Sequence, residues 1–152
     1  MPSPTSVPRF VRIGNFFTTS MLRAGFKLVG PEHRPMYLLT VQGRKSGQPR
    51  TTPIVVIEED GQRYLLAPFG AVDWVRNLRA AGTAVLTRGR RDEQVQAREL
   101  GRDEAGLALK RSVEGGIPSF LTKYFDVTKE SSLEECERAV ELHPVFLLQH
   151  AA

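Results

Sequence analysis

A short polar segment, residues 43–50, carries several groups that bind anions. It lies between two apolar stretches with the composition of strands, so we expect it to form a connecting loop. Arg44 and Arg50 can each offer a two-pronged guanidinium to a phosphate or carboxylate. Lys45 adds a mobile ammonium group and Ser46 a hydroxyl. The segment predicts a site for a ligand with several negative charges, and a solvated hairpin turn remains the alternative.

The rest of the chain offers few groups for chemistry by the protein alone. The spacing of the basic loop excludes a P-loop, because Lys45 and Ser46 precede the second glycine instead of following it. The sequence contains neither a Gly-x-Ser-x-Gly elbow nor a His-Glu-x-x-His motif. Three scattered histidines and a single cysteine have no metal-ligand spacing, so we expect no metal site. This pattern favours a cofactor that carries the reaction while the protein supplies orientation and electrostatics.

Length and composition indicate one ordinary globular domain. The chain has 152 residues, of which 41% are hydrophobic and 25% charged. The net charge of +4 favours an anionic partner, but aromatic residues are not interleaved with the basic ones, so we expect no nucleic acid. The lone Cys136 is typical of a reducing cytoplasm, and its place on the apolar side of a helical segment predicts a buried core residue.

The N-terminal residues differ from the rest of the chain. We expect residues 1–8 to be a mobile tail, followed by a single domain over 9–152. Within it, residues 9–29 predict an amphipathic helix that has an apolar stripe and no acidic residue. The preferred interpretation is that the stripe covers the core or a partner subunit. A peripheral contact with the inner face of the cell membrane stays open as the alternative.

Patterns of hydrophobicity and turns predict the remaining elements. Residues 36–42, 51–58 and 62–68 predict an antiparallel meander with a tight turn at Asp60 and Gly61. We expect Asp73 to cap a helix over 74–81 that ends at Gly82. The later elements are expected as a hairpin over 83–88 and 93–100, helices over 102–113 and 120–125, a last helix capped by Ser131 or Ser132, and a returning strand over 144–148. About six short strands indicate a small antiparallel barrel with helices at its ends.

Several motifs in this order resemble one family of oxidoreductases. They are the basic loop followed by Pro53, the segment 66–71, Trp74 followed by Asn77 and Leu78, and the segment 143–147. Together they resemble the deazaflavin-dependent nitroreductases and quinone reductases over nearly the whole chain. The resemblance implies a mainly β, antiparallel split β-barrel with flanking helices, related to FMN-binding proteins. It also implies an enzyme in which reduced coenzyme F420 gives hydride to a quinone, a nitro compound or an enone.

The same resemblance implies the roles of individual residues. The basic loop of the family holds the phosphate and oligoglutamate tail, the segment after the third strand lies beside the ring system, and the Trp and Asn form a wall of the site. The cofactor-binding residues that follow are Arg44, Lys45, Ser46, Arg50, Pro53, Ala67, Pro68, Gly70, Ala71, Trp74 and Asn77. Tyr124 is the candidate catalytic residue, lining the acceptor pocket or donating a proton. Core packing for Trp74 and a structural role for Tyr124 are the alternatives.

One segment departs from the family pattern. Residues 68–71 are Pro-Phe-Gly-Ala where better-known members have Ser-Lys-Gly-Gly, so the hydroxyl near the ring is missing. Two alternatives therefore stay open. One is a non-catalytic protein of the same fold that binds a cofactor or a fatty acid, and the other is an FMN-dependent oxidoreductase. In every case the expected partner is a small molecule, and the chain is expected to be a monomer or a homodimer.

Overall fold

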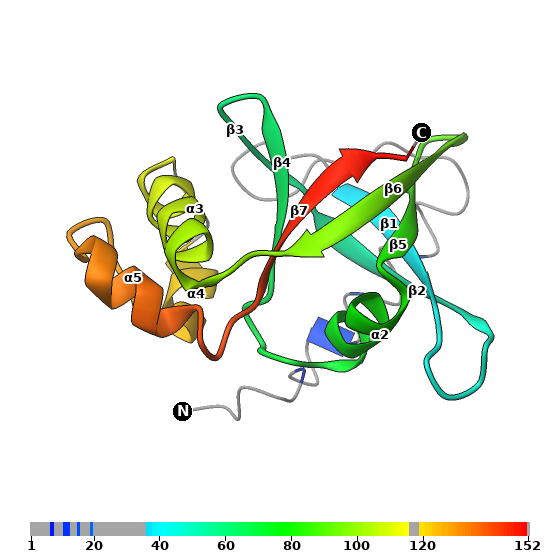
Figure 1. Cartoon of the computed structure of the whole chain (residues 1–152), viewed down its shortest axis with the longest axis horizontal. Helices are drawn as coiled ribbons and strands as arrows, with labels where there is room; N and C mark the ends of the chain where they lie inside the picture. The colour runs from blue at the N-terminus through cyan, green and yellow to red at the C-terminus, as the bar shows by residue number, and fades with distance from the viewer. Residues whose placement is uncertain are drawn as a thin grey trace.

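The computed structural model describes residues 7, 11, 12, 15, 19, 36–115 and 119–151, and a curled antiparallel sheet dominates it (Figure 1). The predicted tail over 1–8 and the amphipathic helix over 9–29 lie largely outside these residues. Among the described helices, none is long and apolar enough to cross a membrane.

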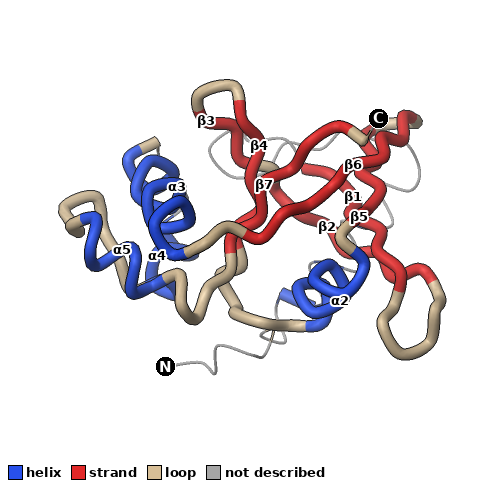
Figure 2. The backbone as a smooth tube through the Cα atoms, in the orientation of Figure 1, coloured by secondary structure: helices blue, strands red, loops and turns tan. Residues whose placement is uncertain are grey.

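The sheet has seven strands that curl into a split barrel (Figure 2). In chain order they are β1 (Met36–Gln42), β2 (Pro49–Val55), β3 (Ile57–Glu59), β4 (Gln62–Leu66), β5 (Thr83–Arg88), β6 (Arg91–Glu99) and β7 (Val145–His150). Their spatial order is β2-β1-β5-β6-β7-β4-β3, so β2 and β3 form the two edges. Only Val56 separates these two strands in the chain, so the sheet must curl until its edges approach each other. The expected mainly β, antiparallel split barrel with flanking helices is confirmed.

The prediction of one strand over 51–58 is wrong, because the chain bends at the fully buried Val56. The part before the bend pairs with β1, and the part after it pairs with β4. An unbroken apolar run gives no sign of such a bend, which explains why seven strands form instead of about six. The predicted turn between β3 and β4 is present, with positive φ at both Asp60 and Gly61.

Four described helices flank the sheet, and the ends of α2, α3 and α4 lie within one residue of the predicted ones. They are α2 (Asp73–Ala81), α3 (Arg102–Glu114), α4 (Ser119–Phe125) and α5 (Leu133–Ala139). Asp73 was expected to cap α2 but is its first helical residue, and Val72 before it supplies no side-chain cap. Gly82 ends α2 with a φ of 71°. Ser132 caps α5, because its Oγ accepts a hydrogen bond of 3.1 Å from the Glu135 N–H.

Two apolar clusters stabilise the fold. One fills the barrel, with fully buried Leu39, Leu65 and Phe146. The other lies between the sheet and α3, α4 and α5, and includes Phe125 and Cys136. Cys136 is only 1% exposed, which confirms that it is a core residue. Burial also raises the pKa of its thiol, so it is a poor nucleophile.

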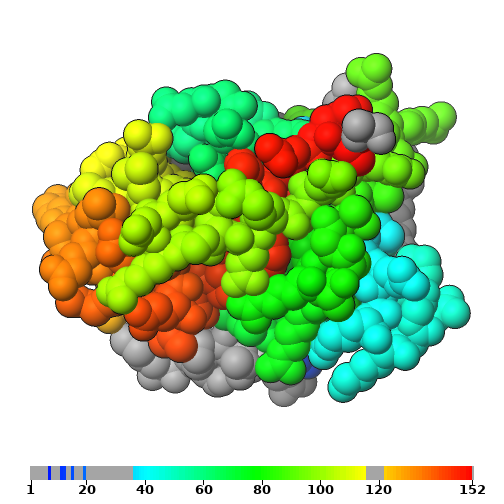
Figure 3. Space-filling model, viewed as in Figure 1, coloured from blue at the N-terminus to red at the C-terminus, as the bar shows by residue number. Residues whose placement is uncertain are grey.

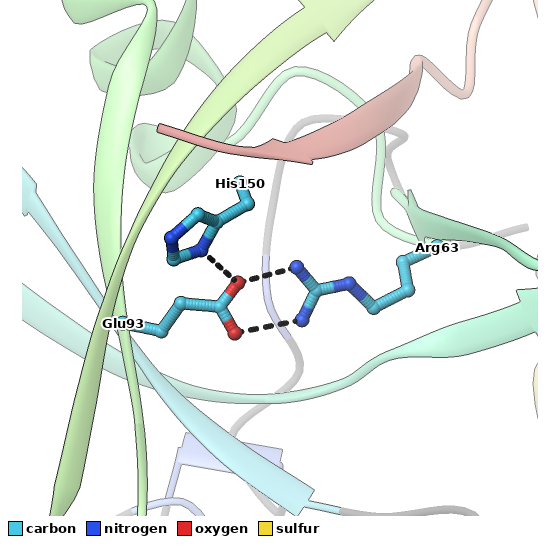
Figure 4. Close-up of polar contacts among 3 residues, drawn as sticks. All are labelled: Arg63, Glu93 and His150. Atoms are coloured by element: carbon cyan, nitrogen blue, oxygen red, sulfur yellow. Dashed lines mark hydrogen bonds and ion pairs between the residues drawn. The ribbon is translucent and has the colours of Figure 1, made fainter. Parts of the chain in front are cut away.

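Ion pairs close one end of the barrel. Arg63 on β4 contacts both carboxylate oxygens of Glu93 on β6, and His150 Nδ1 on β7 lies 3.4 Å from Glu93 Oε2 (Figure 4). The side chains of Arg63 and Glu93 are only 22% and 31% exposed. The hydrogen bonds from Arg63 are the main reason that the pKa of Glu93 lies below its usual value. Arg63 and Glu93 therefore neutralise each other at this end of the barrel.

Candidate functional site

A cavity of about 890 Å³ lies between the basic loop and the start of α2. Figure 3 shows the loop, in cyan, beside the green segment that contains α2. Arg44, Lys45, Ser46, Arg50, Ala71, Trp74 and Asn77 are the predicted cofactor residues that line it. The structure therefore brings together the basic loop and the Trp and Asn of α2, which are about thirty residues apart in the sequence.

The lining of the cavity is strongly basic. Its cationic residues are Arg12, Arg44, Lys45, Arg50 and Arg76, whereas Asp73 is the single acidic residue among the described lining residues. Within the described part of the chain, Lys45, Arg50 and Arg76 form no ion pair and no side-chain hydrogen bond. Cations held near one another without counterions repel, so the cavity has a positive potential that attracts an anion.

Arg44 differs from the other cations because the protein itself binds its side chain. Its backbone N–H and its Nη1 both donate to Oδ1 of Asn77, at 3.1 and 2.8 Å. Its Nη2 lies 3.3 Å from Oδ1 of Asp73. Asn77 is only 4% exposed, so its carbonyl oxygen is a fixed acceptor. Arg44 thereby holds the basic loop on α2, a role that the sequence did not predict.

The basic loop has a compact backbone that depends on its glycines. The N–H of Gly43 donates to the carbonyl of Gln48 at 2.8 Å, and the N–H of Gly47 donates to the carbonyl of Gly43 at 2.9 Å. A Cβ at Gly43 would lie 2.9 Å from Ser46 Oγ and 3.0 Å from the Gln48 carbonyl oxygen. Gly47 has a φ of 70°, which other residues rarely adopt. Ser46 Oγ accepts from the Gln48 N–H at 3.2 Å, so this hydroxyl also supports the loop.

The first turn of α2 contributes to the same cavity. Ala71, Val72, Asp73 and Trp74 all line it. Val72 provides no side-chain cap, so the first N–H groups of the helix have no side-chain acceptor among the described residues. The N-terminal end of a helix carries a partial positive charge, which adds to the charge of the arginines. The cavity is therefore suited to phosphate or carboxylate groups.

The segment after β4 is held firmly at the edge of the cavity. The N–H of Ala67 donates to the Pro144 carbonyl at 3.1 Å, and its carbonyl accepts from the Gly70 N–H at 3.1 Å and from His143 Nδ1 at 3.0 Å. Burial is the main cause of the lowered pKa of His143, which favours a neutral ring with its proton on Nδ1. Gly70 has a φ of 76°, which explains the glycine at this turn.

The structure does not bring every predicted site residue into the cavity. Pro53, Ala67, Pro68 and Gly70 do not line it, although Ala71 continues the same segment into its wall. Tyr124 lies outside the lining as well. Its ring packs edge-on against Phe69, with 4.9 Å between the centroids. Tyr124 therefore lies beside the segment over 67–71 and not beside the basic loop.

The sequence analysis missed the three charged lining residues Arg12, Asp73 and Arg76. Asp73 was noted only as a helix cap. Helical spacing could have identified Arg76, because residues 73, 76 and 77 share one face of an α-helix and Asn77 was already a candidate. Arg12 belongs to the N-terminal segment, whose basic residues were considered only for the alternative contact with a membrane and not for this cavity.

Comparisons with known proteins agree with this geometry. Residues 17–129 match the F420H(2)-dependent quinone reductase family. A solved F420-H2 dependent reductase, FDR-A, is 28% identical over 76% of this chain and 95% of its own, with a TM-score of 0.52. A structure described as a domain-swapped dimer is 28% identical over 92% of this chain and 97% of its own, with a TM-score of 0.56.

A more distant structure supports the fold alone. The protein Atu2129 from Agrobacterium tumefaciens, of unknown function, is 17% identical over 98% of this chain and 59% of its own, with a TM-score of 0.55. The family match, in contrast, spans most of the chain. This protein belongs to the F420H(2)-dependent quinone reductase family and is an oxidoreductase that depends on coenzyme F420.

Proposed function

We propose that the protein uses reduced F420 to transfer hydride to a small hydrophobic electrophile, such as a quinone, a nitro compound or an enone. The observation that carries this proposal is the basic cavity, in which Lys45, Arg50 and Arg76 have no counterion among the described residues. F420 has a phosphate and an oligoglutamate tail, and such a ligand needs several charge-assisted donors on one surface.

The residues present fit this cofactor. A volume of about 890 Å³ is within the usual range for ligand sites, roughly 300–1,000 Å³. Lys45, Arg50 and Arg76 are the residues that would bind the tail. Trp74 and Ala71 line the same cavity and would form its wall beside the deazaflavin ring system. When bound, the reduced deazaflavin supplies the hydride, so the protein needs no covalent nucleophile.

The acceptor side is assigned to the aromatic residues around the segment over 67–71. Tyr124 and Phe69 pack together there, and Lys123 Nζ lies 5.1 Å from the centre of the Tyr124 ring. An apolar surface of this kind suits a flat hydrophobic acceptor. Tyr124 remains our candidate to line the acceptor pocket or to donate a proton to the reduced product.

Partners and location are part of the same proposal. The similar structure described as a domain-swapped dimer leads us to propose a homodimer for this chain. We place the protein in the cytoplasm. The proposed contact of the segment over 9–29 with a membrane concerns residues that lie mostly outside the described ones. Sedimentation with anionic liposomes, with and without this segment, tests that contact.

Fluorescence titration of the purified protein with F420, and in parallel with FMN, tests the proposal. We expect salt-sensitive binding of F420 and much weaker binding of FMN. Protein loaded with reduced F420 should then oxidise it faster when menadione is added. Preference for FMN would identify a flavin-dependent relative instead. Binding of F420 without any reaction with a panel of quinones, nitro compounds and enones would favour the non-catalytic binding protein, as the missing hydroxyl in residues 68–71 allows.

A further inference from the structure

Asp73 is the acidic exception in a basic cavity. Among the described lining residues it faces five cationic ones. Its side chain is 89% exposed, so it remains fully hydrated and loses little by staying charged. Its carboxylate is nonetheless not free, because Oδ1 lies 3.3 Å from Nη2 of Arg44. An ion pair therefore occupies the cavity wall where an incoming anion would meet Arg44.

The position of this ion pair divides the cations into two groups. Arg44 is held from both sides, by Asn77 at 2.8 Å and by Asp73. Lys45, Arg50 and Arg76 have no such partner in the described part of the chain. A small anion that approaches Arg44 meets the negative charge of Asp73 and must compete with it. A ligand whose charges lie on several separate groups can contact the three unpaired cations without displacing the ion pair.

We propose that Asp73 is a specificity-determining residue, which keeps small anions out of the basic cavity and reserves it for ligands with several separated negative charges. The inference deepens the proposed function, on which it rests, because the phosphate and oligoglutamate tail of F420 is such a ligand. Inorganic phosphate and other small metabolite anions are abundant competitors for any basic cavity. A local negative charge that penalises them more than the cofactor provides discrimination by a repulsive element.

The test compares Asp73→Asn with the wild-type protein. Trp74 is the single tryptophan of the chain and lines the cavity, so its fluorescence reports occupation directly. Pyrophosphate is the small-anion probe and F420 the extended ligand, both titrated at low ionic strength where exposed charges are least screened. We expect Asp73→Asn to bind pyrophosphate about threefold tighter, in line with the loss of one exposed ion-pair partner, and to gain clearly less affinity for F420, so that the preference for F420 falls.

Two further variants control for net charge and for side-chain shape. Glu130→Gln removes one negative charge from an exposed loop residue outside the cavity lining, and it should leave both affinities unchanged. Asp73→Glu keeps the charge and should keep the wild-type preference. Equal pyrophosphate affinity in wild type and Asp73→Asn would overturn the inference, and so would a gain of the same size in Glu130→Gln.

The outcomes also separate this inference from the proposed function. Wild-type protein that binds F420, together with an Asp73→Asn variant that does not gain affinity for pyrophosphate, contradicts only the role of Asp73. Wild-type protein that does not bind F420 contradicts the proposed function, whatever happens with pyrophosphate. Weaker binding of both ligands to Asp73→Asn would overturn the inference too, because Asp73 would then support the loop instead of excluding small anions.

Discussion

Both ends of the barrel present arginines, but the partners of these arginines differ. At the end with the Tyr37 ring, Arg88 lies over that ring, and its buried Nη1 has no hydrogen-bond partner among the described residues. Arg63 is bound by Glu93 at the closed end. At the cavity end, Arg50 and Arg76 have no ion pair with a described residue. The strands show that these ends are opposite. β1 begins near Arg88, whose guanidinium lies over the Tyr37 ring, and ends at the cavity, which Val41 lines.

This difference separates arginines that stabilise the fold from arginines that are available to bind a ligand. A paired arginine contributes to stability, and its pairing leaves little attraction for an outside anion. Unpaired cations close together repel one another and destabilise the folded chain slightly, so they are better explained by a ligand than by the fold. Arg44 lies between the two classes, because it lines the cavity and is also bound by Asn77.

The largest expected effect is on the cavity end. Replacing Lys45 and Arg50 by Ala together should weaken F420 binding by about 3 kcal/mol, roughly a hundredfold, because two charge-assisted contacts are lost. The free energy of unfolding should hardly change, since neither side chain has a partner in the described structure. Fluorescence titration and urea unfolding measure the two quantities.

The control for this double variant is a pair of basic residues outside the cavity. Lys110 and Arg111 are such residues, because they pair with Glu114 and with Asp60. Replacing both by Ala makes the same change in net charge and should leave F420 affinity unchanged. Unaltered F420 affinity in the variant with Lys45 and Arg50 replaced would show that the tail is bound elsewhere.

The closed end should give the opposite pattern. Glu93→Gln removes the charge that pairs with Arg63, and a partly buried guanidinium then keeps its charge without a counterion. We expect the free energy of unfolding to fall by about 2 kcal/mol, less than for a fully buried pair, and F420 affinity to stay the same. Urea unfolding with Glu130→Gln as the control tests this. A loss of F420 affinity in Glu93→Gln would mean that the two ends are not independent.

The sequence predicted much of this structure because its strongest signals are local. Aliphatic and β-branched residues identified the strand over 36–42, and alternation with a charged turn identified the hairpin after Gly82. Ser132 caps α5 as expected. The bend at Val56 was missed because it follows from the closing of the barrel and not from any local residue pattern. Likewise, the capping of α2 by Asp73 was a prediction from residue type, and the chain instead begins the helix one residue earlier.

The candidate site was predicted unevenly for a related reason. Residue type alone indicated that Lys45 and Arg50 could bind an anion. The contact of Arg44 with Asn77 depends on where the loop meets α2, which no local signal specifies. Arg12 and Arg76 line the cavity because tertiary packing brings their segments next to the basic loop. The placement of Tyr124 by Phe69 and outside the cavity lining also comes from packing between distant segments.

A variant of Asn77 tests whether Arg44 supports the fold, ligand binding or both. Asn77→Ala removes the oxygen that accepts from both the backbone N–H and Nη1 of Arg44. We expect a loss of about 1–2 kcal/mol in the free energy of unfolding, because partly buried donors lose their partner. F420 affinity should also fall several-fold as the basic loop loses its fixed position. A change in only one of the two measurements would place Arg44 fully in one class.

The smallest expected effect is on the pH dependence of the unfolding free energy, to which His143 and Glu93 contribute in different pH ranges. His143 binds the Ala67 carbonyl, and burial holds its pKa below the ordinary 6.5, so the unfolded chain takes up this proton first. Stability from the neutral imidazole is therefore present above pH 6.5 and is lost as the pH falls towards the folded-state pKa, with a slope of at most about 1.4 kcal/mol per pH unit. Glu93, whose pKa is lowered from 4.5, loses its contribution only in more acidic solution.

The variant His143→Gln tests this contribution, because it keeps a donor for the Ala67 carbonyl but does not titrate. Between pH 7.5 and 5.5 its free energy of unfolding, measured in urea, should fall less than that of the wild type. The other histidines are common to both proteins and cancel, and an equal fall in both would show that His143 has no part in the pH dependence.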